Sequence, residues 1–444
     1  MFIRRCTIGL FFICAWCMLR LPPAMGTEYD YINITNPFLR KIPIAIPVFK
    51  AESDLKTEGD LCRKSSDLLA ESLEFTSYFN ILDRRSFLFD PQKDSIVTQN
   101  INYKNWTVIG AELLVTGGVA IQNGIVQMEL RLIDTFKSRM LIGKRYHGKP
   151  ENYREMVRRF CNDVILTLTG REGIFNSKIA FISNGTGNKE IFVCDFDGYN
   201  PKQFTDNRAI TLFPAWSSDG KWMAYTSYKN KTPELFIRHI EENRGTIVSR
   251  EGINSSPCWI PGVFELGATL SFSGDPEIYR LTGNGKIIKR LTNQRGIDSS
   301  PSFSPDGKEM AFVSERSGTP QIYIKNLATG NIRRLTFQGR YNTQPSWSPY
   351  GGKIAFSSMD NGNHNIHVIG EDGSGHVQLT WNSGNNESPS WSPDGSLIVF
   401  SSSREGLSKS KIYVMTAFGT DQRRLLNMPG QQTNPKWSPG YIKD

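Results

Sequence analysis

The sequence contains few of the residues that usually form catalytic or metal-binding sites. Only five histidines occur in 444 residues, and the Gly-x-Ser-x-Gly motif that carries the nucleophile of many hydrolases is absent. His364 and His367 stand three residues apart beside a predicted strand, and side chains at that spacing point to opposite faces of a strand. We therefore expect no catalytic residue, no metal ion and no cofactor.

Long hydrophobic runs are absent except near the N-terminus. Arg4 and Arg5 precede an apolar run from Ile8 to Leu19, and Ala24-Met25-Gly26 is a small-x-small cleavage pattern. We predict a cleaved secretory signal peptide at residues 1–26 and no transmembrane segment in the mature chain. A retained membrane anchor is the alternative, but the run is short for a transmembrane helix and Arg20 ends it.

Cysteine is scarce too, with seven in the whole chain. Three fall within residues 1–26, and Cys62, Cys161, Cys194 and Cys258 remain, without metal-ligand spacing or a Cys-x-x-Cys motif. Export allows disulfides, and Cys62 with Cys161 is the pair to test, because both fall on predicted helices of one domain. Buried thiols that pack as small apolar groups are the alternative.

A strong excess of charge of one sign is absent as well. The formal net charge is +9, and it falls to +6 once the three arginines of the signal peptide are removed. The basic residues are scattered, without the runs or stripes of a nucleic-acid-binding surface. We therefore expect no nucleic-acid partner.

The sequence does contain a clear internal repeat. A Pro-x-aromatic motif begins at Pro214, Pro257, Pro301, Pro345, Pro389 and Pro435, at intervals of 43 to 46 residues. Most copies continue with a sequence close to Ser-Pro-Asp-Gly, in which Asp219, Asp306 and Asp394 precede glycine and favour hairpin turns. A short apolar strand follows each turn, and two further strands complete the period. Four strands in a period of this length are typical of a β-propeller blade.

The first and last copies of the repeat are incomplete in complementary ways. Residues 177–183 match the second strand of a blade without a first, whereas residues 435–440 supply a first strand without a second. We expect six blades and a ring closed by the C-terminal strand, which leaves no open sheet edge. The repeated aromatic residues are predicted to pack each blade against the next; they are Trp216, Trp259, Phe303, Trp347, Trp391 and Trp437.

Residues 27–170 are predicted to form an α/β domain. Apolar residues alternate between Ile42 and Val48, where Pro43 and Pro47 favour a strand at a sheet edge. Helices are predicted at residues 60–76 and 153–169, the second ended by Gly170, and strands at 113–121, 126–132 and 140–146. Residues 171–176 are predicted to be a linker into the propeller at residues 177–444.

The repeats resemble those of the TolB family, and two further stretches support this resemblance. Residues 168–175, Leu-Thr-Gly-Arg-Glu-Gly-Ile-Phe, followed by Lys178-Ile179-Ala180-Phe181, resemble the domain junction of that family. Residues 110–117, Gly-Ala-Glu-Leu-Leu-Val-Thr-Gly, are similar to its N-terminal domain. The resemblance implies an α/β domain followed by an all-β six-bladed propeller, in a periplasmic protein of Gram-negative bacteria.

The resemblance also implies a function and two partners. In that family the propeller binds the peptidoglycan-associated lipoprotein Pal, and the extreme N-terminal segment contacts TolA. Such a non-catalytic scaffold of the Tol-Pal system links the inner-membrane Tol complex to Pal, maintains outer-membrane integrity and supports envelope constriction during cell division. Other outer-membrane lipoproteins are further candidate partners, and we expect a monomer.

The family's Pal-binding face is the one on which the Pro-x-aromatic strands begin. The matching positions here are Asn254, Ser255, Ser256, Asp298, Ser299, Ser300, Asn342, Thr343, Gln344, Asn386, Glu387 and Ser388. Short polar side chains on clustered loops offer adaptable hydrogen bonding, but Ser and Asn also form turns without binding anything. The TolA-contacting segment matches Glu28, Tyr29, Asp30, Tyr31, Ile32 and Asn33, whose alternation suits either addition to the edge of a partner's sheet or folding back.

Two points stay open on the sequence alone. The second copy of the repeat continues as Trp259-Ile260-Pro261-Gly262 and lacks Ser-Pro-Asp-Gly, so its hairpin is in question. The alternative function is a propeller enzyme with a channel active site, either a carbohydrate lyase or a peptidase-related protein. The repeated aspartates would be its candidate carboxylates, although their turn positions account for them without catalysis.

Overall fold

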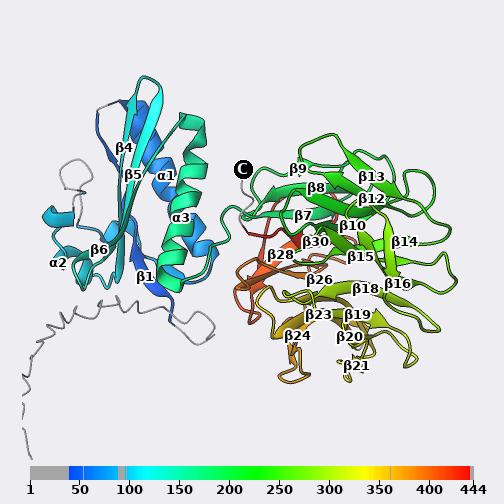
Figure 1. Cartoon of the computed structure of the whole chain (residues 1–444). Helices are drawn as coiled ribbons and strands as arrows, with labels where there is room; N and C mark the ends of the chain where they lie inside the picture. The colour runs from blue at the N-terminus through cyan, green and yellow to red at the C-terminus, as the bar shows by residue number, and fades with distance from the viewer. Residues whose placement is uncertain (1–39, 54, 89–95, 97, 361, 441–444) are drawn as a thin grey trace, which may run out of the picture.

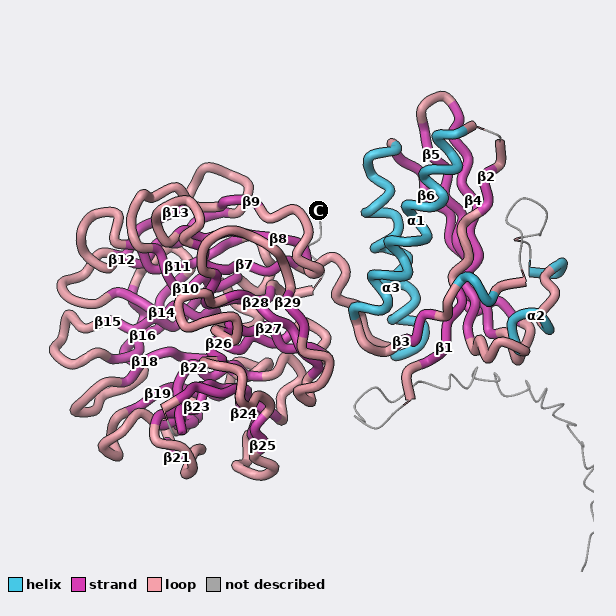
Figure 2. Tube along the Cα trace, turned by 180° about the vertical axis from the view of Figure 1, so that it is seen from behind, coloured by secondary structure: helices cyan, strands magenta, loops and turns pink. Residues whose placement is uncertain are grey.

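The protein consists of an N-terminal α/β region followed by a six-bladed β-propeller (Figures 1 and 2). The computed structural model describes residues 40–53, 55–88, 96, 98–360 and 362–440. The predicted signal peptide and the segment Glu28–Asn33 lie outside these residues. The predicted order of an α/β region and a closed six-bladed ring is confirmed.

The N-terminal region is a mixed sheet with two long helices against one face (Figure 1). Its strands follow the order β3-β1-β4-β5-β6, and β2 pairs with β4. Buried side chains of the helices, such as Leu69 and Phe160, meet buried sheet residues such as Leu130 to form the core. The elements are β1 (Ile42–Ala45), β2 (Lys50–Ala51), α1 (Lys56–Phe75), β3 (Phe79–Ile81), α2 (Lys104–Thr107), β4 (Leu113–Gln122), β5 (Ile125–Asp134), β6 (Arg139–Gly148) and α3 (Tyr153–Thr169).

The expectation that the prolines place the first strand at a sheet edge is wrong. Strand β1 lies between β3 and β4 and pairs with both in parallel. Its pairing with β4 begins only at Ile44, so the N–H that Pro43 lacks falls before that ladder. The Pro43 carbonyl still accepts a hydrogen bond from the Glu112 amide, and Pro47 follows the end of the strand.

Each propeller blade is a four-stranded antiparallel sheet, and the strands of the repeat follow one another in order. Five blades are continuous in the sequence. The first blade consists of β10 (Thr211–Trp216), β11 (Trp222–Ser227), β12 (Glu234–His239) and β13 (Gly245–Val248), and the second of β14 (Asn254–Trp259), β15 (Glu265–Leu270), β16 (Glu277–Thr282) and β17 (Ile287–Arg290). The third consists of β18 (Asp298–Phe303), β19 (Glu309–Ser314), β20 (Gln321–Asn326) and β21 (Ile332–Arg334), and the fourth of β22 (Tyr341–Trp347), β23 (Lys353–Asp360), β24 (Asn363–Gly370) and β25 (Val377–Gln378). The fifth consists of β26 (Asn386–Trp391), β27 (Leu397–Ser402), β28 (Lys411–Thr416) and β29 (Arg423–Arg424).

The sixth blade joins the two ends of the propeller, as the incomplete repeats predict. Strand β30 (Gln432–Trp437) pairs with β7 (Lys178–Ser183), which is followed by β8 (Glu190–Asp195) and β9 (Lys202–Gln203). The ladder runs from Gln432 opposite Ser183 to Trp437 opposite Ile179. The C-terminal strand therefore closes the ring.

The repeated tryptophans connect neighbouring blades. Each is almost fully buried, and the indole N–H of three of them donates to a carbonyl of the preceding blade, whereas Trp347 and Trp437 donate to Glu371 and Ser177 of their own blades. The Trp259 indole donates to the Ala215 carbonyl at 3.1 Å, and the Trp391 indole donates to the Ser346 carbonyl at 3.0 Å. The Trp216 indole donates to the Lys436 carbonyl at 3.1 Å and so spans the closure.

The Asp-Gly pairs form the predicted turns. In the third blade, Asp306 accepts hydrogen bonds from the Ser304 hydroxyl at 2.7 Å and the Lys308 amide at 3.1 Å, and Gly307 has a φ of +67°. The second blade lacks this sequence but keeps its hairpin, because Gly262 takes a φ of +77° and the Ile260 amide donates to the Glu265 carbonyl. Phe264 packs beside Trp259 in place of the missing polar turn.

The segment between the two regions is anchored by buried aromatic residues. Helix α3 ends at Gly170, whose φ of +70° is left-handed, and Phe175 is fully buried a few residues later. Phe175 packs edge-on against Phe196 of the propeller at 5.3 Å between ring centroids, and Phe75 of α1 packs on the same ring at 5.3 Å. One buried apolar cluster therefore continues from the N-terminal region into the propeller.

Candidate functional site: the channel-mouth face

One end of the propeller faces the N-terminal region and the opposite end does not (Figure 1). The first hairpin of each blade, such as those at Tyr350 and Asp394, belongs to the facing end, where these residues line a cavity together with Lys41 and Tyr78. Successive strands of a blade are antiparallel, so the starts of the first strands lie at the opposite end. We call this opposite end, with its blade-to-blade connections and second hairpins, the channel-mouth face.

The predicted binding residues of the first position are buried supports of the connections. Asn254, Asp298, Asn342 and Asn386 each have at most 1% of their surface exposed. The Asn254 amide donates to the Arg250 carbonyl at 2.7 Å, and the Asn342 amide donates to the Gln321 side chain at 2.8 Å. Asp298 accepts from Arg316 at 2.8 Å, although burial raises the pKa of its carboxyl group. These side chains hold the loops in shape from beneath.

The residues of the second position are half-buried at the rim of the channel. They are Ser255, Ser299, Thr343 and Glu387. Each pairs with the second strand of its blade, as Ser299 does with Val313 and Glu387 with Ser401. They are the last regularly paired residues before a break in each ladder.

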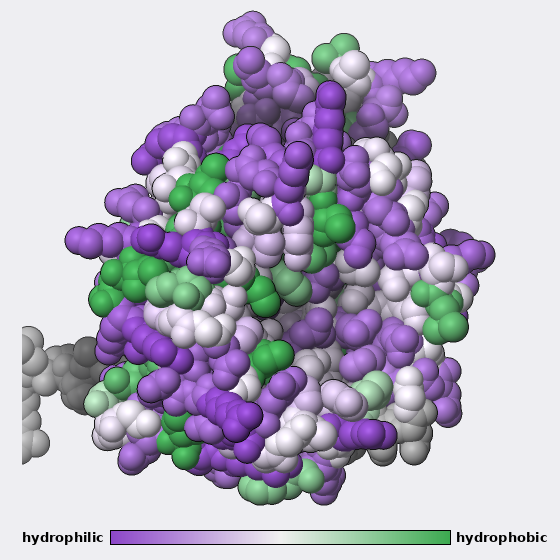
Figure 3. Space-filling model, turned by 90° about the vertical axis from the view of Figure 1, so that its right-hand side faces the viewer, coloured by the Kyte–Doolittle hydropathy of each residue, from purple (hydrophilic) through white to green (hydrophobic). Residues whose placement is uncertain are grey.

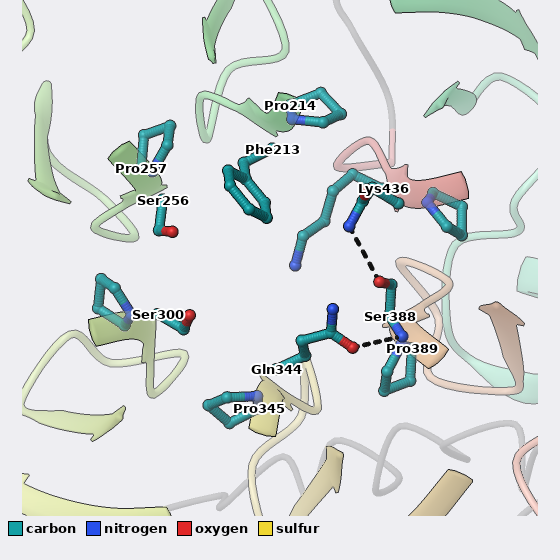
Figure 4. Close-up of a pocket in the computed structure, with 13 residues that line it drawn as sticks. Phe213, Pro214, Ser256, Pro257, Ser300, Gln344, Pro345, Ser388, Pro389 and Lys436 are labelled. Carbon is teal, nitrogen blue, oxygen red and sulfur yellow. Dashed lines mark hydrogen bonds between the residues drawn. The ribbon is translucent and has the colours of Figure 1, made fainter. Parts of the chain in front are cut away.

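The residues of the third position lie inside the channel. Ser256, Ser300, Gln344 and Ser388 line it together with Phe213 and Asn434 (Figure 4). All six have a left-handed backbone, with φ between +49° and +58°, and each stands directly before a repeated proline at a β-bulge. The channel, including its open mouth, has a volume of about 530 Å³.

Two members of this channel ring, Phe213 and Asn434, were missed by the sequence reasoning. Both could have been found, because they precede Pro214 and Pro435 just as the four predicted residues precede their prolines. The predicted list covered only the four middle blades. Asn434 donates to the Ser388 hydroxyl at 3.0 Å, and Gln344 accepts from the Ser388 amide at 2.8 Å. One half of the ring is therefore connected by hydrogen bonds.

Exposed apolar side chains lie on the connections and second hairpins of the channel-mouth face, and these were missed too. They are Ile210, Tyr228, Ile253, Phe272, Ile297, Phe337, Trp381 and Leu407, and we call them the apolar collar. The carbonyls of Ile210, Ile253 and Ile297 accept hydrogen bonds from Tyr228, Ser271 and Glu315 of the neighbouring hairpins. Viewed end-on, hydrophobic residues are spread among hydrophilic ones around a hollowed centre (Figure 3). The available signal was an apolar residue four positions before three of the prolines.

The described residues offer little support for an enzyme site. No group of three or more His, Cys, Asp or Glu side chains in the described part of the chain could hold a metal ion. His367 lies against His376 at 2.9 Å between ring nitrogens, in a blade edge rather than the channel. Asp306 and Asp394 are bound within their turns, at the end of the propeller remote from the mouth.

The four described cysteines are free thiols. Cys62 and Cys161 are buried in the N-terminal core without a disulfide between them, in agreement with the alternative of packed thiols. Burial raises the pKa of Cys62 to about 12. No helix among the described residues is long and apolar enough to cross a membrane.

Comparison with known proteins identifies relatives of the whole chain. The model of the TolB amino-terminal domain matches residues 30–141, and that of the TolB β-propeller domain matches residues 166–441. The Tol-Pal system protein TolB of Desulfosudis oleivorans is 66% identical over 422 residues, which cover 95% of this chain and 96% of that protein. The Protein TolB homolog of Chlorobium chlorochromatii is 42% identical over 62% of each chain.

A solved structure supports the same relationship. The crystal structure of TolB from Acinetobacter baumannii superposes with a TM-score of 0.78 at 26% sequence identity, over 90% of this chain and 97% of that one. The α/β region and the propeller are both included in that coverage. The sequence matches and the shared architecture together show that this chain belongs to the TolB family.

Proposed function

We propose that this chain is a non-catalytic, periplasmic protein-binding scaffold of the Tol-Pal system. Its channel-mouth face binds a peptidoglycan-associated lipoprotein of the Pal type, and the segment Glu28–Asn33 contacts TolA. The chain so links the inner-membrane Tol complex to the outer membrane, which supports membrane integrity and constriction during division. Residues 1–26 are a signal peptide, 27–170 the α/β domain, 171–176 the linker and 177–444 the propeller, in a monomer.

The observation that supports this proposal best is the apolar collar on an otherwise polar face. Exposed aromatic side chains such as those of the collar are enriched at protein interfaces, where polar residues surround them. Trp381 is 57% exposed and Phe337 74% exposed, on loops that buried side chains such as Asn342 hold rigidly. A rigid surface loses little conformational entropy on binding.

A non-catalytic role agrees with the chemistry of the channel. Its described lining contains hydroxyl, amide, aromatic and proline groups and one lysine, without a carboxylate or histidine to act as acid or base. The half-buried rim residues Ser255, Ser299, Thr343 and Glu387 remain candidate contacts beside the collar. The buried Asn254, Asp298, Asn342 and Asn386 are better suited to support the loops.

Titration calorimetry with the purified periplasmic domain of a Pal-type lipoprotein from the same organism tests the proposal. Ile297→Asp places a charge in the collar and is expected to weaken binding by about tenfold or more, because central apolar contacts carry much of the energy of an interface. Ile288→Asp is the matched control, since Ile288 is similarly exposed but lies on β17, the outer strand of the preceding blade. Absence of binding by the folded, unchanged protein contradicts the proposal.

A further inference from the structure

The channel contains a cation without a compensating anion. Lys436 of β30 is the one charged residue among the described residues that line the channel, and its side chain extends toward the channel centre (Figure 4). No described carboxylate lies within ion-pairing distance of it. Five of the six repeats place a small residue at this position, namely Ala215, Cys258, Ser302, Ser346 and Ser390. The ammonium group is therefore particular to the closing strand.

Two hydroxyl groups face the same space as the ammonium group. Ser256 and Ser300, from neighbouring blades, direct their hydroxyls toward the centre of the channel (Figure 4). Neither hydroxyl makes a hydrogen bond to the described part of the chain, whereas Gln344, Ser388 and Asn434 are bonded to one another. The half of the ring outside this hydrogen-bonded group thus presents hydroxyl donors and, among the described residues, no charged acceptor.

The surroundings of Lys436 make an unpaired ammonium unfavourable. Burial lowers its pKa, because the charged form loses hydration that nothing in the channel replaces. The ionisable group that acts on it is Cys258, and burial raises the pKa of that thiol, so it stays uncharged. An anion in the channel would supply the missing counter-charge.

We propose that the channel mouth is an oxyanion-binding site formed by Lys436 Nζ, Ser256 Oγ and Ser300 Oγ. Its ligand is a carboxylate or a small inorganic oxyanion, because one ammonium and two hydroxyl donors match a group with several acceptor oxygens and a negative charge. The carboxylate of an acidic side chain on a docked protein and a free anion are the two sources of this chemistry. The site itself does not depend on the identity of the partner.

Selenate is the probe, because its heavy atom is located directly by anomalous diffraction. We expect selenate density in the channel between Lys436, Ser256 and Ser300, and binding in solution by titration calorimetry. Lys436→Met is expected to weaken selenate binding by about tenfold or more, as a charge-assisted hydrogen bond is lost. Lys308→Met removes a lysine that lies outside the channel and is 77% exposed, and it is expected to leave selenate binding unchanged.

A second variant protects the test against misfolding. Ser256→Ala with Ser300→Ala leaves Lys436 in place, and it is expected to weaken selenate binding while thermal unfolding stays unchanged. Equal selenate affinity in the wild type and in folded Lys436→Met overturns the site, as does selenate bound only elsewhere.

The same titrations distinguish the two sources. If a partner's acidic side chain is the ligand, selenate competes with the Pal-type domain and Lys436→Met weakens its binding. If a free anion is the ligand, selenate binds but leaves partner binding unchanged. Selenate binding by the isolated chain is measured without any partner, so failure of the proposed function does not affect it.

Discussion

Removal of the last repeated tryptophan should expose how much the closure of the ring contributes to stability. Trp437 lies on β30, which pairs with β7 from the other end of the propeller. Its side chain is 6% exposed, its indole N–H donates to the Ser177 hydroxyl at 2.7 Å, and its backbone amide donates to the Ser390 hydroxyl at 3.0 Å. We therefore choose Trp437→Ala as the perturbation.

The expected loss follows from burial and the hydrogen bond. Replacing a buried tryptophan by alanine typically costs about 3–5 kcal/mol, through lost apolar burial and the cavity left behind. The Ser177 hydroxyl loses a donor but still donates to the Ile174 carbonyl, so no large penalty for an unpaired group is added. We expect the free energy of unfolding to fall by about 3–5 kcal/mol, with the backbone bond to Ser390 retained.

Urea unfolding followed by far-ultraviolet circular dichroism is the assay, because the loss of a tryptophan alters the fluorescence signal itself. Trp381→Ala is the control, since Trp381 is 57% exposed and its removal should change stability by no more than about 0.5 kcal/mol. A loss below about 1 kcal/mol for Trp437→Ala would refute the reasoning. So would equal losses in the two variants.

Three further experiments have definite expected outcomes. Burial raises the pKa of the Asp394 carboxyl group above its ordinary value of 3.8, so ionisation of Asp394 lowers the stability of the fold as pH rises through that raised pKa. Hydrogen bonds from the Ser304 hydroxyl and the Lys308 amide lower the pKa of Asp306, so ionisation of Asp306 adds stability, which is lost as pH falls. Relative to the wild type, urea unfolding should therefore show Asp394→Asn gaining stability between acid and neutral pH and Asp306→Asn losing it; equal trends contradict this. Arg158→Met removes the arginine that pairs with both Asp195 and Asp197 at the junction, while Lys178 still pairs with Asp195 and Arg154 with Asp197. We expect it to lower stability by about 1.5–3 kcal/mol and to speed cleavage at the junction in limited proteolysis, whereas Arg159→Met, at an exposed pair, should do neither. Cys62, Cys161 and Cys194 should resist a thiol reagent in the native protein, and all four mature cysteines should react in denaturant when counted by mass spectrometry; fewer than four labels indicates a disulfide.

The architecture could be predicted from the sequence because each local signal agrees with the others. The phase of the repeat places a lone second strand at residues 177–183 and a lone first strand at 435–440, and only a closed ring pairs them. The aromatic positions of the repeat predict packing between blades, and the Asp-Gly positions predict hairpin turns. The prediction from Pro43 was wrong because the effect of a proline on strand pairing depends on which neighbouring strand its missing N–H would face. The pairing of β1 with β4, which begins only at Ile44, decides this.

The binding face was harder to predict because its residues are distinguished by direction. Asn254, Ser255 and Ser256 are consecutive and polar, yet one is buried beneath the loop, one pairs at the rim and one lines the channel. The β-bulge and the left-handed residue point these three side chains in different directions, and the residue types alone do not predict those directions. The apolar collar was overlooked because Ile253 and Ile297 look like ordinary strand residues in a β-rich sequence.

The residue before each repeated proline has the same left-handed backbone in every blade, so the side chain that lines the channel can vary without a change in the backbone of the ring. Phe213, Gln344 and Asn434 occupy the same backbone conformation although their side chains differ in size and polarity. The bulge is fixed by the flanking ladders and the proline, so substitution at these positions changes what a ligand meets while the blades stay in place. The binding specificity of the channel can thus change through substitutions in single blades, without a change in the fold of the propeller.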